Sequence, residues 1–121
     1  MNRVIIAGGR KFSDYELLEY RVIGLLDAYM DDLKLEIVSG GARGADKLGE
    51  RFANEHNIPV KLFQADWGTY GHGAGPVRNQ EMADYADVLV AFWDGESTGT
   101  NDMIMRAMHS GLDLHVFRYE K

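Results

Sequence analysis

The sequence of 121 residues contains no cysteine, so disulfide bonds and thiolate chemistry are excluded. Long apolar runs are missing as well. The longest, Val88 to Trp93, is far shorter than the roughly 18 residues that a membrane-spanning helix needs. The N-terminus leads directly into a strand-like segment and shows no signal peptide. These absences predict a cytoplasmic protein without a membrane partner.

Positive charge is also scarce. The chain has 13 Lys and Arg against 19 Asp and Glu, which gives a formal net charge of −6. Proteins that bind nucleic acid non-specifically usually carry the opposite sign, so bulk nucleic acid is not an expected partner. A small phosphorylated ligand in a locally basic pocket is compatible with this charge. No metal is expected, because the four histidines lack metal-ligand spacing and there is no cysteine to support them. No other cofactor is expected.

Strand-like and helix-like segments alternate along the chain. Apolar runs predict strands over residues 3–7, 35–39, 60–63, 88–93 and 114–117. Helices are expected after residue 13, from 45 to about 57, over 77–85 and over 100–110. Short parallel strands with right-handed crossovers give an α/β three-layer sandwich with a five-stranded parallel sheet. Residues 1–121 are expected to form a single domain.

Several residues mark the ends of these elements. Ser13 and Glu16 fit a capping box, which predicts Ser13 as the N-cap of the first helix. Gly111 stands where a glycine ends a helix. The glycine-rich segment 65–76 is expected to be irregular. One face of the first helix is predicted to consist of Leu18, Val22, Leu25 and Tyr29.

Glycine-rich turns follow several predicted strands and carry most of the chain's chemistry. The carboxyl ends of parallel strands meet at one edge of a sheet, and ligands of open α/β sheets bind beyond that edge. Glycine lets a backbone approach a ligand closely, and helix N-termini favour anions. The cations in or just after these turns are Arg10, Lys11, Arg43 and Arg78. The pattern predicts a phosphate site, with tight turns of purely structural purpose as the alternative.

Candidate ligand-binding residues come from these turns and their neighbours. Carboxylates there can accept hydrogen bonds from ribose hydroxyl groups or act as general bases, although Asp46 and Asp102 can equally cap helices. Trp67 can stack on a base or cover the core. Arg78 opens a predicted helix, where an arginine opposes the helix dipole unless an anion compensates it. The candidates are Gly9, Arg10, Gly40, Gly41, Arg43, Gly44, Asp46, Asp66, Trp67, Asn79, Gly99 and Thr100.

Five motifs occur in a fixed order: GGRKF at 8–12, SGGARGAD at 39–46, ADW at 65–67, AGPVRN at 74–79, and the turn 95–100. This set, which covers nearly the whole chain, resembles the SLOG superfamily of Smf/DprA and LOG proteins, and most closely its small YspA-related, DUF2493-type branch. The resemblance implies a Rossmann-like fold with strand order 3-2-1-4-5. It also implies a pocket for a nucleotide or an ADP-ribose-like ligand, and self-association as in LOG proteins.

LOG proteins are phosphoribohydrolases that use an arginine and the glutamate of a Pro-Gly-Gly-x-Gly-Thr-x-x-Glu motif. Here Gly99-Thr100 matches the Gly-Thr of that motif and Arg78 looks like the arginine, but Met103 occupies the glutamate position. The candidate catalytic residues are therefore Arg78 with Asp102 or Glu96. Three functions follow: a nucleotide-sensing binding module, a hydrolase of a nucleotide N-glycosidic or phosphate bond, and single-stranded DNA binding as in DprA relatives.

Overall fold

The computed structural model describes residues 2–27 and 34–120. Within these residues the strands are β1 (Asn2–Gly8), β2 (Leu35–Ser39), β3 (Val60–Leu62), β4 (Val88–Trp93) and β5 (Asp113–Arg118). The helices are α1 (Tyr15–Leu26), α2 (Ala45–Glu55), α3 (Trp67–Tyr70), α4 (Ala74–Tyr85) and α5 (Thr98–His109), with a 3₁₀ turn η2 (Gly71–Gly73). None of the described helices combines the length and apolar character that crossing a bilayer requires.

All the strands lie in one parallel sheet with the order β3-β2-β1-β4-β5. The predicted five-stranded α/β sheet and its strand order are thus confirmed. From β1 the chain extends the sheet outward through β2 to β3, and then returns to place β4 and β5 on the other side of β1. The strand order therefore reverses between β1 and β4, which is where ligands of open α/β sheets bind.

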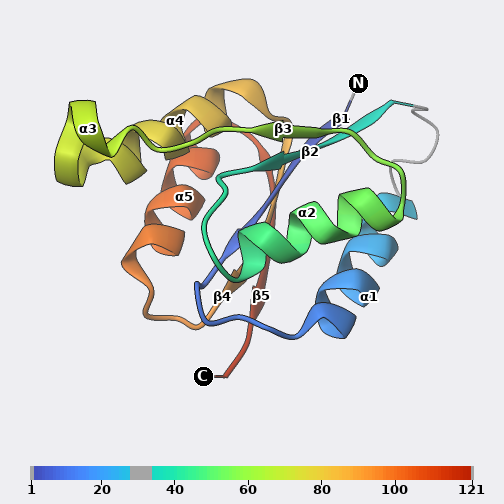
Figure 1. Ribbon diagram of the computed structural model, residues 1–121. Helices are drawn as coiled ribbons and strands as arrows, with labels where there is room; N and C mark the ends of the chain where they lie inside the picture. Colours follow the sequence, from blue (N-terminus) through green and yellow to red (C-terminus); the bar gives the residue numbers. More distant parts are fainter. Residues whose placement is uncertain (1, 28–33, 121) are drawn as a thin grey trace.

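Helices cover both faces of the sheet, as Figure 1 shows: α1 and α2 lie on one side, α4 and α5 on the other. Successive side chains of a strand point to opposite faces. On β1, Val4 and Ile6 belong to the core beneath α1 and α2, whereas Ile5 and Ala7 belong to the core beneath α4 and α5. Burial on both faces explains why the central strands are nearly unbroken apolar runs.

Helix α1 begins with a different cap from the one that the sequence predicts. Asp14, not Ser13, is the N-cap, and its Oδ1 accepts a hydrogen bond from the Leu17 N–H at 3.0 Å. The predicted capping box with Glu16 is therefore wrong, because aspartate and serine cap equally well and stand side by side here. Of the predicted apolar face, Leu18 and Val22 are buried, Leu25 is half-buried, and Tyr29 lies outside the described residues.

The glycine-rich segment 65–76 is more regular than expected. Asp66 starts α3 by accepting a hydrogen bond from the Thr69 N–H at 3.1 Å. Helix α4 then begins at Ala74 rather than Val77. Pro76 is compatible with this earlier start because the first turn of a helix does not use its N–H groups. The proline and glycines that suggested a loop thus belong to helix starts.

Helix α5 also begins earlier than predicted, at Thr98 instead of Thr100, so Gly99 lies inside its first turn. Its predicted end is close to the observed one. Gly111 follows the C-cap Ser110 and has a φ of +81°. This left-handed conformation favours glycine and stops the helix before β5.

We expect Phe92→Ala to destabilise the fold by about 3–5 kcal/mol, because the change leaves a large cavity in the core. Phe92 is fully buried and stacks on Phe12 with a ring separation of 4.8 Å. Urea denaturation measures the loss. The control is Tyr20→Ala, which removes a side chain that is 72% exposed. Equal losses in the two variants would contradict the assignment of Phe92 to the core.

Candidate functional site

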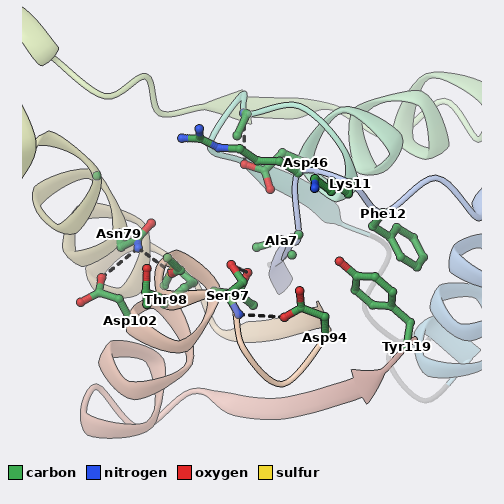
Figure 2. A pocket seen from close by; sticks show the side chains of 18 of the residues that line it. Ala7, Lys11, Phe12, Asp46, Asn79, Asp94, Ser97, Thr98, Asp102 and Tyr119 are labelled. Atoms are coloured by element: carbon green, nitrogen blue, oxygen red, sulfur yellow. Dashed lines mark hydrogen bonds between the residues drawn. The ribbon is translucent and has the colours of Figure 1, made fainter. Parts of the chain in front are cut away.

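An open cleft of about 1200 Å³, the larger cleft, lies beyond the carboxyl ends of β1 and β4. The turn after β1, the start of α1, the first turns of α4 and α5, and residues 118–120 line it. Figure 2 shows Asn79 and Asp102 on one side and Phe12 and Tyr119 on the opposite side. The cleft therefore occupies the place where the strand order reverses.

A second depression, the smaller hollow, has a volume of about 360 Å³ and adjoins the larger cleft. The turn after β2, from Gly40 to Arg43, and residues 64–65 after β3 line it. The two depressions share Arg10, Ala42, Trp67 and Arg78. Most of the predicted site residues thus come together at one edge of the sheet.

Three cationic side chains at these depressions have no partner among residues 2–27 and 34–120. Among residues 2–27 and 34–120, Arg10, Lys11 and Arg43 are the only Arg or Lys side chains without one. Lys11 borders the larger cleft, Arg43 borders the smaller hollow, and Arg10 borders both. In an acidic chain, unpaired positive charge is therefore confined to this edge in the part that the structure describes.

Arg78 has a different position from the predicted one. Since α4 begins at Ala74, Arg78 lies in the second turn, and its Nη1 donates a hydrogen bond to the Gly40 carbonyl oxygen at 2.6 Å. Its Nε donates to Asn79 Oδ1 at 3.0 Å. The argument that a helix-opening arginine needs an external anion is therefore wrong. Arg78 instead ties the turn after β2 to α4, at the boundary between the two depressions.

Several predicted ligand glycines make room for protein atoms. A Cβ at Gly40 would lie 2.6 Å from Arg78 Nη1, and one at Gly9 would overlap the Tyr119 hydroxyl. At Gly44, where φ is +80°, a Cβ would overlap the Gly9 carbonyl oxygen. Structural packing thus accounts for these glycines. Gly99 differs, because it borders the larger cleft and a Cβ there would meet no atom within 4 Å.

Asp46 is a buried carboxylate in the wall of the larger cleft. It is 5% exposed, and its Oδ2 accepts a hydrogen bond from the Ala42 N–H at 3.2 Å. Burial raises its pKa to about 6, although the Ala42 N–H and the positive charge of Arg78 act in the opposite direction. Asp46 therefore does not cap α2, whose N-cap is Gly44. Perturbed titratable groups in clefts are typical of functional sites.

A polar network joins α4 to α5 beside the cleft. The buried Asn79 donates through Nδ2 to Asp102 Oδ2 at 2.9 Å, and Arg106 Nε donates to the same oxygen at 2.9 Å. Arg106 Nη1 also donates to Gln80 Oε1 at 3.1 Å. Asp102 thus borders the cleft while serving as a structural brace. The buried Thr100 lies within hydrogen-bond distance of Ser97, with 3.2 Å between their hydroxyl oxygens.

Three predicted site residues do not line either depression. Asp66 caps α3, and Gly44 packs against the turn after β1. Glu96 is exposed, and its N–H donates to Asp94 Oδ1 at 2.8 Å within the turn after β4. Arg78 and Asp102 both line the larger cleft, whereas Glu96 does not, so of the two predicted catalytic pairs only Arg78 with Asp102 comes together there.

The predicted set also omits several residues that line the larger cleft. Lys11 lines the cleft beside Arg10; it is among the predicted cations of this edge but not among the candidate ligand-binding residues. Ser97 and Thr98 were omitted because α5 starts earlier than predicted. Tyr119 follows β5, whose carboxyl end reaches the same edge of the sheet. The centroids of the Tyr119 and Phe12 rings are 4.8 Å apart. Topology, rather than a local motif, could have identified Tyr119.

Comparison with known proteins identifies the family. The family described as YspA, cpYpsA-related SLOG (YAcAr) matches residues 2–70. The chain belongs to this SLOG family. The Gene 61 protein of Mycobacterium phage D29 is 37% identical to this SLOG chain over 125 aligned residues, which cover 94% of each protein.

A solved structure supports the fold. DNA processing protein A (DprA) from Streptococcus pneumoniae superposes with a TM-score of 0.72 at 18% sequence identity. The match covers 95% of the SLOG chain and 49% of the DprA chain, so the chain spans about half the length of that protein. At this identity the likeness shows the shared fold alone.

The residue that replaces the LOG glutamate in this SLOG chain is part of the hydrophobic core. Met103, at the position of the LOG glutamate, is 2% exposed and belongs to the core beneath α4 and α5. Its neighbour Asp102 points into the Asn79–Arg106 network instead. At the position of the LOG glutamate this chain therefore has a buried methionine in place of a carboxylate.

We expect the raised pKa of the buried Asp46 carboxyl group to make the stability of the protein depend on pH. Its pKa is about 6 in the folded state against 3.8 as the reference value, so the folded state binds the proton more tightly. This group's contribution to stability is therefore greatest below about pH 4 and falls as the pH rises to about 6. Two pKa units correspond to about 3 kcal/mol.

Asp46→Asn removes this titration, so the variant should gain about 3 kcal/mol relative to the wild type between pH 4 and pH 7. Urea denaturation of both proteins over this range measures the difference. All other carboxyl groups are common to the two proteins and cancel. A difference that does not change with pH would show that the Asp46 pKa is not raised.

Proposed function

We propose that this SLOG domain binds a nucleotide or a nucleotide-derived ligand, through phosphate, at the larger cleft. The observation that carries the proposal is the confinement of unpartnered Arg10, Lys11 and Arg43 to one edge of a chain with net charge −6. An unpaired cation keeps its donors available for a phosphate. Every other described Arg or Lys side chain already has a partner inside the protein.

The surroundings of the larger cleft support the same ligand class. The first turn of α5, including Thr98 and Gly99, borders it, and the start of a helix offers N–H groups to an anion. The polar groups of Asp46, Asn79 and Asp102 lie in its wall and can accept or donate hydrogen bonds to sugar hydroxyl groups. Its volume of about 1200 Å³ exceeds what one nucleotide needs.

A hydrolytic role is the second candidate, and Asp46 favours it. A carboxyl group with a pKa of about 6 can exchange a proton near neutral pH, as a general acid or base must. Arg78 and Asp102 are held in internal hydrogen bonds, which makes them positioning groups in this scheme. Chromatography of nucleotides incubated with the protein tests this role. Release of base or ribose phosphate that Asp46→Asn abolishes would support it, and no release would reject it.

Binding of single-stranded DNA is the third candidate, because the structural neighbour is named a DNA processing protein. The net charge of −6 opposes it. Gel-shift measurements at low salt decide the matter: a retarded single strand whose binding is lost in Arg10→Ala would favour DNA over a small nucleotide.

We expect Lys11→Ala to weaken nucleotide binding by about tenfold, since one charge-assisted contact to phosphate contributes roughly 1.4 kcal/mol. Isothermal titration calorimetry with nucleoside monophosphates measures the effect. The matched control is Lys47→Ala, because Lys47 is 58% exposed, pairs with Glu50 and borders neither depression. Equal affinities of both variants would contradict a role for the turn after β1, and no binding by the wild type at millimolar concentration would reject the proposed function.

A further inference from the structure

The smaller hollow is lined by a positive charge that does not line the larger cleft. Arg43 borders the smaller hollow and not the larger cleft, while Lys11 borders the larger cleft and not the smaller hollow. Arg10 lies on their common boundary. Because none of the three side chains has a partner in the described part of the chain, a single phosphate group beside Lys11 leaves Arg43 without a counter-charge.

Arg78 and Trp67 form the boundary between the two depressions. Arg78 is held there by its hydrogen bonds to the Gly40 carbonyl oxygen and to Asn79 Oδ1. Trp67 also borders both depressions, and its side chain is 54% exposed. An exposed tryptophan ring beside cations suits a flat aromatic base.

We propose that the ligand extends through both depressions and is a dinucleotide, two nucleosides joined through a diphosphate. The first nucleoside lies in the larger cleft, the diphosphate lies over Arg10 between Lys11 and Arg43, and the second nucleoside enters the smaller hollow beside Trp67. The volume of about 360 Å³ is sufficient for a part of this size. This inference rests on the proposed function and specifies its ligand class.

The test compares a mononucleotide with the dinucleotide that contains it. Calorimetry with AMP, GMP, CMP and UMP first selects the nucleoside monophosphate that binds most tightly. The symmetric dinucleoside diphosphate of the same base is then titrated; it has one negative charge on each phosphate, so its total charge is similar to that of the monophosphate. We expect it to bind at least about tenfold more tightly.

Variants assign the gain to the smaller hollow. Arg43→Ala should weaken dinucleotide binding by about tenfold and monophosphate binding by a smaller factor, because Arg43 borders the smaller hollow and not the larger cleft. Arg43→Lys should restore part of the dinucleotide affinity. Lys11→Ala should weaken both ligands by a similar factor, and Lys47→Ala neither. Thermal melting verifies that the Arg43 variants fold, as expected for an exposed side chain without a partner.

The outcomes separate this inference from the proposed function. If monophosphate and dinucleotide bind equally well and Arg43→Ala affects neither, the dinucleotide is rejected while nucleotide binding stands. If inorganic diphosphate competes as well as the dinucleotide, the second nucleoside has no site. If a hexadeoxynucleotide binds more tightly than the dinucleotide and depends on Arg43, the surface is a nucleic-acid site instead. If no nucleotide binds at millimolar concentration, both proposals are rejected.

Discussion

The carbonyl oxygen of Gly9 holds the candidate site together. It accepts hydrogen bonds from the Phe12 N–H within its own turn and from the Ala45 N–H at the start of α2, each at 3.2 Å. The turn after β1 and the start of α2 can approach each other this closely because Gly44 has no side chain. This contact brings the turn that carries Arg10 and Lys11 next to the turn that carries Arg43.

Glycine therefore acts here mainly between protein segments. In phosphate-binding loops, glycines are often explained by the close approach of a ligand to the backbone. The missing side chains of Gly9, Gly40 and Gly44 instead leave space for Tyr119, Arg78 and the Gly9 carbonyl group, respectively. The recognition of an anion is then left to flexible side chains and to the open first turn of α5 around Gly99. Such a surface selects a ligand by the position of its negative charge more than by its shape.

The fold was accessible from the sequence because its evidence is periodic and repeated. Apolar runs such as residues 88–93 predict buried parallel strands, and the SLOG-like motifs supplied their order. Boundaries failed where two residues satisfy the same rule. Asp14 and Ser13 are both good caps, and Pro76 fits either a loop or the first turn of a helix. Local patterns cannot choose between such alternatives, whereas tertiary packing can.

The site was predictable in location but not in the roles of its residues. Strand ends identify an edge, and the glycines and cations there identify Arg10, Arg43 and Asp46. Whether an arginine side chain is available to a ligand or already hydrogen-bonded within the protein depends on contacts between distant segments. Arg78 and the Gly40 carbonyl group are 38 residues apart, and no local signal indicates their hydrogen bond.

The same bond limits what the acidic neighbour of Arg78 can do. Arg78 lowers the pKa of Asp46, but its guanidinium also serves the Gly40 carbonyl group, and burial is the larger effect. The carboxyl group therefore remains close to half-protonated at mildly acidic pH. When protonated it no longer repels a phosphate and can donate a hydrogen bond, whereas the ionised form can only accept one. The buried acid thus makes the charge of the cleft depend on pH.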